Sequence, residues 1–414
     1  MKINSEKEKP VVLMLSTYPF RVPRHGGQVR LFNLAKTYAS ANWLVKSIAI
    51  FEPEVGYSFG SIGKEDIPFP YDSKYRKFKG RNVPLINDLL AGYFAISEAG
   101  GYRSVLSKLP KKIDAIHVEQ PWLWPLASKI SKLRQYKDVC LIYGSQNIEM
   151  PLKKEILNNY NINNVTDVLD AIDKLEKRAT READISIGVT KKDLDILIKW
   201  GAKRPLLACN GIEPWIPSIK KIDHWQKKLP SVPWVLYIAS AHPPNFVGFI
   251  KSIGETLGCI PPTSKLVVAG SVCKHLYDEF KKSRFSSLNL SRIEMLGILS
   301  DEDLDAVKSL AHAFLLPIPH GGGSNIKTAE ALYSGSYVIA SKPAMRGFEE
   351  FSKYPEVMVA CNPKEIRKYI RETLMKPRLN SSVKNRLRQS LSWNKCLASI
   401  PDEVDLVLRK RGNK

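Results

Sequence analysis

The sequence is poor in acidic residues. It contains 63 lysines and arginines against 41 aspartates and glutamates, which gives a formal net charge of +22. This excess favours an anionic partner, and membrane lipid, nucleic acid and a phosphorylated substrate all fit the charge alone. No nucleic-acid recognition motif accompanies the charge, so we expect no nucleic-acid partner.

Long apolar runs and paired cysteines are also missing. No run approaches the roughly 20 apolar residues that a membrane-spanning helix needs. The six cysteines are scattered without a CxxC pair, so we expect small buried side chains in a reducing compartment. Lysines precede the apolar segment 11–15, but this segment is too short for a signal peptide and predicts a strand. We expect a cytoplasmic protein, with the inner face of a membrane as an alternative peripheral location.

With 414 residues, the chain is too long for one ordinary hydrophobic core, so two domains are expected. Residues 214–233 contain four prolines and are interpreted as a linker. The expected parts are an N-terminal domain at 1–213, a C-terminal domain at 234–390, and a final helical segment at 391–414 that crosses back to the first domain.

Short apolar runs alternate with helical patterns along both halves. Such alternation predicts parallel sheets covered by helices, that is, an α/β fold with two doubly wound, Rossmann-like domains. The expected strands are 11–16, 44–51, 113–119, 139–145, 185–189 and 205–209 in the first half, and 235–239, 265–270, 293–296, 313–318, 337–340 and 357–360 in the second.

The stretch 319–340 carries the strongest functional pattern. Three glycines, Gly321, Gly322 and Gly323, follow an apolar run, and Ser324 or Asn325 can then cap a helix. A glycine-rich turn at a helix N-terminus presents free N–H groups to phosphates. Lys327 and Glu330 lie three residues apart in the first helical turns, where a cation suits a phosphate and a carboxylate suits a ribose diol. The simpler alternative is a strand–turn–helix whose glycines serve packing only.

This stretch resembles the donor-site signature of the family 4 retaining glycosyltransferases, which have the GT-B fold of two Rossmann-like domains facing a central cleft. The resemblance implies that Glu330 binds the ribose of a nucleotide sugar, while the backbone of Gly321 to Ser324 meets sugar and phosphate. Many members carry a glutamate where this chain has Gly322. Sugar recognition by that first carboxylate is therefore absent or replaced here.

Two segments of the first half resemble further family motifs. Gly26 and Gly27 match a loop that faces the donor diphosphate or the acceptor, and His25 is either an assisting group or a solvated loop residue. In the segment Asp114 to Glu119, the resemblance places His117 near the anomeric centre as the catalytic residue. Glu119 is either an acceptor contact or a polar loop group.

Two segments of the second half complete the expected donor site. The turn from His242 to Asn245 replaces a family loop that usually carries a basic residue, so His242 and Lys327 are expected to supply the positive charge. Arg346 and Gly347 resemble a loop whose backbone amides meet the donor sugar or phosphate.

Two other patterns have competing interpretations. Basic residues alternate with Tyr75 and Phe78 between positions 74 and 81, which suits an anionic membrane surface or nucleic-acid backbone, or a solvated loop. Asp193 and Asp195 match a D-x-D metal motif, but they fall in an expected helix and are interpreted as surface carboxylates. No metal site is therefore predicted.

Together these features predict an enzyme that transfers a sugar from a nucleotide-diphosphate sugar to an acceptor hydroxyl. The resemblance implies retention of anomeric configuration, no divalent metal and no cofactor besides the donor substrate. The acceptor would be a glycan, a glycolipid or a lipid-linked polysaccharide precursor. The alternative is a non-catalytic GT-B subunit that binds a nucleotide or sugar within a glycan assembly system.

Overall fold

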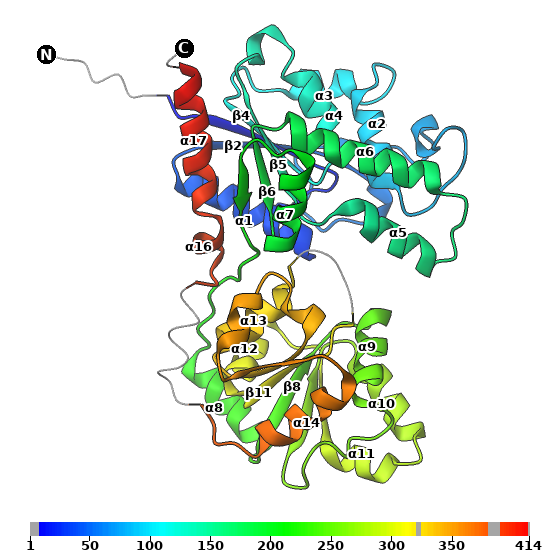
Figure 1. Ribbon diagram of the computed structural model, residues 1–414, viewed down its shortest axis with the longest axis vertical. Coiled ribbons are helices and arrows are strands. Elements are labelled where there is room, and N and C mark those ends of the chain that lie inside the picture. The colour runs from blue at the N-terminus through cyan, green and yellow to red at the C-terminus, as the bar shows by residue number, and fades with distance from the viewer. Residues whose placement is uncertain (1–7, 320–323, 380–389, 413–414) are drawn as a thin grey trace, which may run out of the picture. The chain divides into compact units, whose positions relative to one another are not determined.

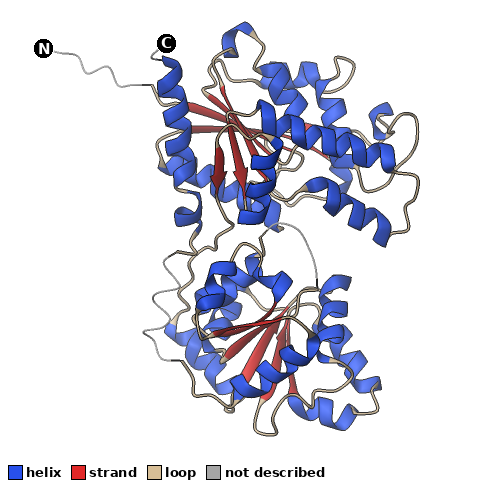
Figure 2. Ribbon diagram, viewed as in Figure 1, coloured by secondary structure: helices blue, strands red, loops and turns tan. Residues whose placement is uncertain are grey.

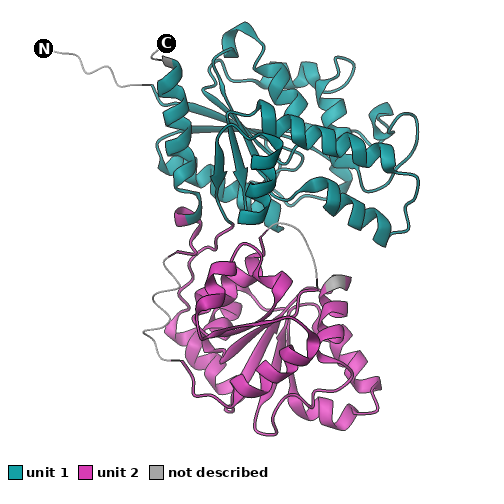
Figure 3. Ribbon diagram, in the orientation of Figure 1, with its two compact units in different colours: residues 1–209, 396–414 teal, residues 210–395 magenta. Residues whose placement is uncertain are grey.

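A computed structural model describes residues 8–319, 324–379 and 390–412. The chain divides into two compact units, which are coloured separately in Figure 3. Unit 1 comprises the residues up to Cys209 and those from Cys396 onward, and unit 2 comprises Asn210–Lys395. Each unit is a parallel sheet covered by helices, as Figures 1 and 2 show.

Unit 1 is built on a seven-stranded sheet with the order β3-β2-β1-β4-β5-β6-β7, in which all neighbouring strands are parallel. Every residue of β1 is buried, because helices cover both faces of the sheet. The strands are β1 (Val11–Ser16), β2 (Leu44–Phe51), β3 (Ile67–Pro68), β4 (Ala115–Glu119), β5 (Cys140–Ser145), β6 (Ile185–Gly188) and β7 (Pro205–Leu207).

Helix α6 buries an apolar stripe that contains Val168, Ile172 and Ala179. The helices of unit 1 are α1 (Gly26–Ser40), α2 (Asn87–Ile96), α3 (Tyr102–Lys108), α4 (Trp124–Ile130), α5 (Glu149–Asn159), α6 (Thr166–Glu182), α7 (Lys191–Trp200) and α17 (Ser399–Gly412), with short 3₁₀ turns η1 (Pro53–Val55), η2 (Lys74–Arg76) and η3 (Arg134–Tyr136).

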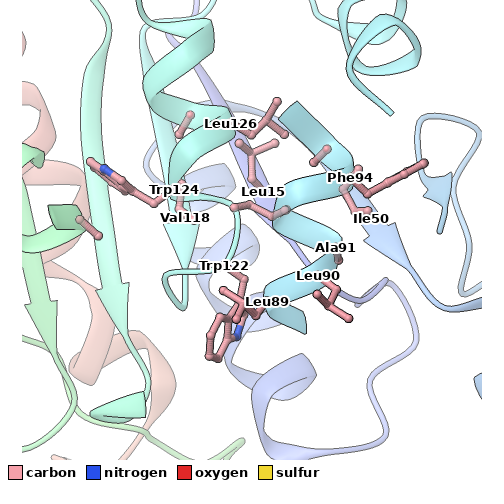
Figure 4. Close-up of a cluster of buried hydrophobic side chains, with 14 of the residues drawn as sticks. Leu15, Ile50, Leu89, Leu90, Ala91, Phe94, Val118, Trp122, Trp124 and Leu126 are labelled. Carbon is pink, nitrogen blue, oxygen red and sulfur yellow. The ribbon is translucent and has the colours of Figure 1, made fainter. Parts of the chain in front are cut away.

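Large side chains fill the core between the sheet and α2, where Figure 4 shows the packing around Trp122. Trp122 and Trp124 are 1% and 0% exposed. Gly92 lets α2 approach closely, since a Cβ there would lie 2.2 Å from the carbonyl oxygen of Trp122. Both tryptophans are therefore core residues.

Unit 2 is built on a six-stranded parallel sheet with the order β10-β9-β8-β11-β12-β13. The strands are β8 (Trp234–Ile238), β9 (Lys265–Ala269), β10 (Ile293–Gly297), β11 (Ala313–Leu316), β12 (Tyr337–Ser341) and β13 (Val357–Ala360). The helices are α8 (Ile219–Lys228), α9 (Pro243–Ile253), α10 (Cys273–Lys282), α11 (Ser286–Arg292), α12 (Asp301–Leu310), α13 (Ile326–Ser334) and α14 (Pro363–Leu374), with η4 (Lys342–Met345) and η5 (Glu349–Lys353).

The segment expected to link the domains, 214–233, contains α8. Ser218 caps this helix by accepting a hydrogen bond from the Lys221 N–H. Both Trp225 Nε1 and Lys221 Nζ donate to Asp303 of α12, at 2.9 and 2.8 Å. The prolines thus flank a helix that packs within unit 2.

The end of the chain contributes to both units. In unit 2, the Ile212 N–H donates to the Leu391 carbonyl at 2.8 Å, and the Trp393 N–H donates to the Ile212 carbonyl at 3.1 Å. The chain then continues through α16 (Trp393–Leu397) into α17. In unit 1, Arg411 of α17 pairs with Asp184 at 2.6 Å.

The basic and aromatic segment 74–81 is held by unit 1 itself. Phe78 is 2% exposed, and Arg76 pairs with Glu52 at 2.9 Å while it lies over the Phe69 ring. Arg81 pairs with Asp167 at 2.7 Å. Phe78 and Arg76 are therefore used for packing and ion pairs within unit 1, whereas the lysines of this run and Arg81 are exposed.

Two smaller expectations are corrected by the structure. Asp193 is buried: its N–H donates to the hydroxyl oxygen of Thr190, which caps α7, and its carboxylate accepts from the same hydroxyl. Cys140, Cys259 and Cys273 are buried as expected, but Cys209 and Cys396 are half-buried and Cys361 is exposed. Within the described ranges, no helix combines the length and apolarity needed to cross a bilayer.

Candidate functional site

Each sheet has one point at which the strand order reverses direction. In unit 1 this point lies between β1 and β4, and in unit 2 between β8 and β11. Open parallel sheets bind ligands in the crevice beyond the carboxyl ends of the strands at such a point. The segments singled out from the sequence lie at the ends of these four strands or follow them: 25–27 after β1, Glu119 at the end of β4, 242–245 after β8, and 324–330 after β11.

In unit 2, helix α13 begins where the sequence predicts. Asn325 caps it, since its Oδ1 accepts from the Lys327 N–H at 3.2 Å. The hydroxyl oxygen of Ser324 accepts from the Asn210 N–H at 3.4 Å. The helix ends at Gly335, whose φ of 68° is left-handed. The expected contacts of Gly321, Gly322 and Gly323 lie outside the described residues.

The start of α9 and the first turn of α13 meet through side chains. Lys327 Nζ donates to Asn245 Oδ1 at 3.2 Å, and Asn245 Nδ2 donates to the Ser240 carbonyl at 3.1 Å. Gly248 also lets α9 approach the chain after β11, because a Cβ there would lie 2.6 Å from Pro319 Cδ. The structure therefore brings Lys327 to the turn in which the family's usual basic residue is missing.

Lys327 is a partly desolvated cation. Burial lowers the pKa of its ammonium group, and the Glu330 carboxylate only partly offsets this. Among the described residues, no carboxylate lies within ion-pair distance of Lys327 Nζ. An anion bound at this point would supply the missing negative charge.

Glu330 is fixed by a lysine from the neighbouring helix. Lys308 Nζ of α12 lies 3.6 Å from Glu330 Oε1 and 2.8 Å from Asp305 Oδ1, and it is also 3.9 Å from the centre of the Trp215 ring. The Glu330 side chain remains 33% exposed. It can therefore accept hydrogen bonds from a ligand while Lys308 holds its position.

The remaining residues predicted for the sugar-donor site are His242, Arg346 and Gly347. His242 is exposed and precedes α9 without a side-chain cap. Arg346 Nη1 donates to the Pro343 carbonyl at 2.6 Å, and Gly347, with φ of 80°, donates from its N–H to Glu349 at 3.0 Å. Thr328 of α13 donates to the Ala344 carbonyl at 2.6 Å, which ties α13 to the loop that carries Arg346.

In unit 1, His117 lies at the centre of a buried polar chain and is 0% exposed. Its Nδ1 lies 3.0 Å from the Tyr38 hydroxyl, and its Nε2 lies 3.1 Å from Glu119 Oε1. Glu119 Oε2 in turn accepts from Arg30 Nε at 3.1 Å. Gly144 makes room for this carboxylate, since a Cβ there would lie 2.1 Å from Glu119 Oε1. Protein groups thus occupy both ring nitrogens of His117.

The positions of the hydrogens in this buried hydrogen-bond network follow from the pKa of Glu119. Burial alone would raise this pKa, but the Arg30 guanidinium and the His117 hydrogen bond lower it to about 2. An ionised carboxylate only accepts hydrogen bonds, so the hydrogen on His117 sits on Nε2. Burial also raises the pKa of the Tyr38 hydroxyl, which stays protonated and donates to Nδ1.

The glycine pair of the first loop begins helix α1. Gly27 permits a close approach, because a Cβ there would lie 2.3 Å from the Tyr18 hydroxyl oxygen and 3.0 Å from Gln146 Oε1. The exposed His25 ring contacts the Tyr18 ring edge-on at 4.9 Å. Gly26 and His25 therefore lie beside a polar cluster that follows β1.

Sequence reasoning missed this cluster as a unit. The Tyr18 hydroxyl lies 3.3 Å from Gln120 Oε1 and 3.4 Å from Gln146 Oε1, and Gln120 Nε2 donates to Glu149 Oε1 at 3.1 Å. Gln146 and Glu149 follow β5, and Tyr18 and Gln120 carry no sequence motif. Their position immediately after β1 and β4 is the signal that could have identified them.

No group of three or more His, Cys, Asp or Glu side chains in the described ranges is arranged to hold a metal ion.

The fold was compared with solved structures, because no protein-family model and no curated protein matches the sequence. Sucrose-phosphate synthase from Thermosynechococcus elongatus is 14% identical with a TM-score of 0.69, covering 97% of this chain and all of that chain. The catalytic domain of starch synthase IV from Arabidopsis thaliana, bound to ADP and acarbose, is 14% identical with a TM-score of 0.65, covering 97% of this chain and all of that chain.

Anabaena HepE in complex with UDP-glucose is 15% identical with a TM-score of 0.62, and the match covers 96% of this chain and 99% of HepE. These neighbours are glycosyltransferases built from two Rossmann-like domains. With two parallel Rossmann-like sheets and near-complete coverage by such neighbours, this chain has the GT-B fold.

Proposed function

We propose that this protein is a glycosyltransferase whose unit 2 binds a nucleotide-diphosphate sugar. The observation that carries the proposal is the placement of Lys327. It stands in the first turn of α13, partly desolvated and 3.2 Å from Asn245, at the reversal point of a parallel sheet. A diphosphate would meet a fixed cation and a helix N-terminus there. The nucleotide ligands of starch synthase IV and HepE support the same substrate class.

The other donor residues have complementary roles in this proposal. Glu330 accepts hydrogen bonds from the ribose hydroxyls, which its anchoring by Lys308 supports. Ser324, Asn325 and the loop of Arg346 and Gly347 line the phosphates and sugar. Departure of the diphosphate creates negative charge, and Lys327 with the α13 dipole stabilises it. The transfer then retains the anomeric configuration and uses no divalent metal.

Unit 1 holds the acceptor, which is a glycan, a glycolipid or a lipid-linked precursor. His117 does not touch the donor in this proposal, since protein groups occupy both of its ring nitrogens. It positions the Glu119 carboxylate instead. A membrane surface is not part of the proposal, because Phe78 and Arg76 of segment 74–81 pack within unit 1.

Calorimetric titration of the full chain with UDP, GDP and ADP tests the donor site. We expect one nucleotide to bind selectively, and Glu330→Ala to weaken it at least tenfold, which is about 1.4 kcal/mol. Glu279→Ala is the matched control, because Glu279 is an exposed helical glutamate of unit 2 that lies on α10. The matching sugar nucleotides are then assayed for transfer, and the anomeric configuration of the product is assigned by NMR.

Absence of binding by all three nucleotides at millimolar concentration would reject the donor site. Selective binding without turnover on any acceptor would favour the alternative, a non-catalytic GT-B subunit that retains nucleotide binding. Turnover with inversion, or turnover abolished by a metal chelator, would reject the proposed mechanism while leaving the donor site in place.

A further inference from the structure

The polar cluster after β1, β4 and β5 in unit 1 has a hydrogen-bonding capacity that the protein does not use. We propose that Tyr18, Gln120, Gln146 and Glu149 form a subsite that binds two neutral hydroxyl groups of an acceptor sugar. This inference rests on the proposed function and names the chemical class of its acceptor. The contacts, the fold position and the charge of the cluster support it separately.

The first support is the balance of donors and acceptors. The Tyr18 hydroxyl has one hydrogen to share between Gln120 Oε1 and Gln146 Oε1, at the long distances of 3.3 and 3.4 Å. Gln146 Nε2 is buried near the Glu119 carboxylate, yet it makes no hydrogen bond of normal geometry to the described residues. The two amide oxygens therefore have capacity left for a ligand, whereas Gln146 Nε2 is a buried donor that a ligand does not reach.

The second support is the position of the cluster. Tyr18 follows β1 and Gln120 follows β4, so the two side chains flank the reversal point of the sheet. Gln146 and Glu149 reach the same place from the end of β5. Tyr18, Gln120 and Gln146 are half-buried and Glu149 is buried, which describes a polar floor with an accessible rim. Gly27 lets the Tyr18 hydroxyl and Gln146 Oε1 pack against the start of α1, because a Cβ there would lie 2.3 and 3.0 Å from these two atoms.

The third support is the low charge of the cluster. Its direct members are two amides, a phenol and a single carboxyl group. Burial and Asp88 raise the pKa of Glu149 to about 7, although Lys153 and the Gln120 and Asn147 hydrogen bonds lower it. Arg30, which is the nearby guanidinium, is committed to Glu119 at 3.1 Å. Such a surface suits sugar hydroxyls, which both donate and accept, and it offers no charge for a phosphate or carboxylate.

Glu149 also makes the subsite sensitive to pH. The ionisable groups that face it come from five elements: Asp88 of α2, Lys153 of α5, Glu176 of α6, Glu119 of β4 and Tyr143 of β5, together with Tyr18. An ionised Glu149 accepts a charge-assisted hydrogen bond from a sugar hydroxyl, which is stronger than a neutral one. Sugar affinity should therefore rise as the pH increases through about 7.

The test is saturation-transfer NMR on the full chain with the methyl glycosides of glucose, galactose, mannose and N-acetylglucosamine, and with glucose 6-phosphate. We expect at least one neutral glycoside to bind, and Gln120→Leu and Gln146→Leu each to weaken it about fivefold or more. Gln226→Leu is the control, because Gln226 is an exposed amide on α8 of unit 2. Glu149→Gln should remove the rise in affinity across neutral pH.

Nucleotide titration of the same variants separates this inference from the proposed function. Intact nucleotide binding without any glycoside binding overturns the subsite alone. Glycoside binding that neither glutamine variant weakens, or a preference for glucose 6-phosphate, also overturns it. Loss of nucleotide binding in the glutamine variants shows a folding defect, and Gly27→Ala, which displaces the Tyr18 hydroxyl without removing a polar group, then decides the question by its effect on glycoside binding. No nucleotide binding by the wild type rejects the proposed function itself.

Discussion

The buried pair between Arg30 and Glu119 offers a direct test of the electrostatics in unit 1. Their side chains are 1% and 0% exposed, and Arg30 Nη1 also donates to the Ala208 carbonyl at 3.0 Å. Arg30→Met would leave the Glu119 carboxylate buried with only His117 and Gln146 beside it. Breaking a buried pair in this way typically costs about 3 to 5 kcal/mol, since the remaining charge is uncompensated.

The double variant Arg30→Met/Glu119→Gln removes that charge, so we expect it to be more stable than Arg30→Met alone. The contribution of Glu119 to stability should also have the opposite pH dependence in Arg30→Met. In the wild type, the pKa of Glu119 is about 2, below its unfolded value, so this group stabilises the fold above about pH 4.5 and loses that contribution as the pH falls towards 2. Without Arg30, burial raises the pKa of Glu119. The stability that Arg30→Met loses relative to the wild type should therefore become smaller as the pH is lowered from 7 to 5.

Urea unfolding, with hydrogen exchange to assign each transition to unit 1 or unit 2, measures these effects. Arg81→Met is the matched control, because Arg81 pairs with Asp167 at 2.7 Å on the exposed surface of the same unit. This control should change stability little. A loss below about 1 kcal/mol for Arg30→Met at pH 7, or an equal loss for Arg81→Met, would refute the reasoning.

Three further predictions concern the two candidate sites. Lys327→Met should weaken nucleoside diphosphate binding about 10- to 100-fold, with the matching nucleoside unaffected, because the lost contact is to phosphate; calorimetry with both ligands measures this. Gly27→Ala should displace Tyr18 and reduce sugar transfer without changing nucleotide affinity, whereas Gly258→Ala, which meets no close atom, should leave both unchanged in the same assays. Because the pKa of Glu149 is raised to about 7 and that of the neighbouring Glu176 to about 8, wild-type stability should fall as the pH rises from 5 to 8; Glu149 contributes on the order of 3 kcal/mol of this fall, and Glu149→Gln should reduce the fall without abolishing it in urea unfolding. A flat wild-type profile would show that this carboxyl is not desolvated.

The strands were the most predictable part of the fold. The runs 11–16 and 44–51 match β1 and β2 to the residue, since β1 is buried along its whole length and β2 along its apolar second half. The start of α7 was equally readable, because a Thr190 cap needs only local residues. Segment 52–81 was not readable. Its structure depends on distant contacts, such as the one in which Asp66 accepts from the Ala49 N–H.

The candidate sites also contain parts that follow from local sequence patterns and parts that depend on distant contacts. Ser324 to Glu330 could be selected from the sequence because a glycine run, a cap and a helix are contiguous there. The contact of Lys327 with Asn245 joins residues 82 positions apart, and that of Tyr18 with Gln146 joins residues 128 positions apart. No local spacing encodes such pairs. His117 shows the reverse case, since its motif is local but its burial and partners come from α1 and β4 packing together.

The division of unit 1 into two stretches of chain has a consequence for biosynthesis. Unit 2 is continuous in sequence, whereas α17, which Arg411 anchors to Asp184, is made only after all of unit 2. During translation the N-terminal sheet therefore leaves the ribosome without one of its helices, while unit 2 already has every strand it needs. Domains generally fold as units as they emerge. The half of the protein that is synthesised second can thus reach its native state first.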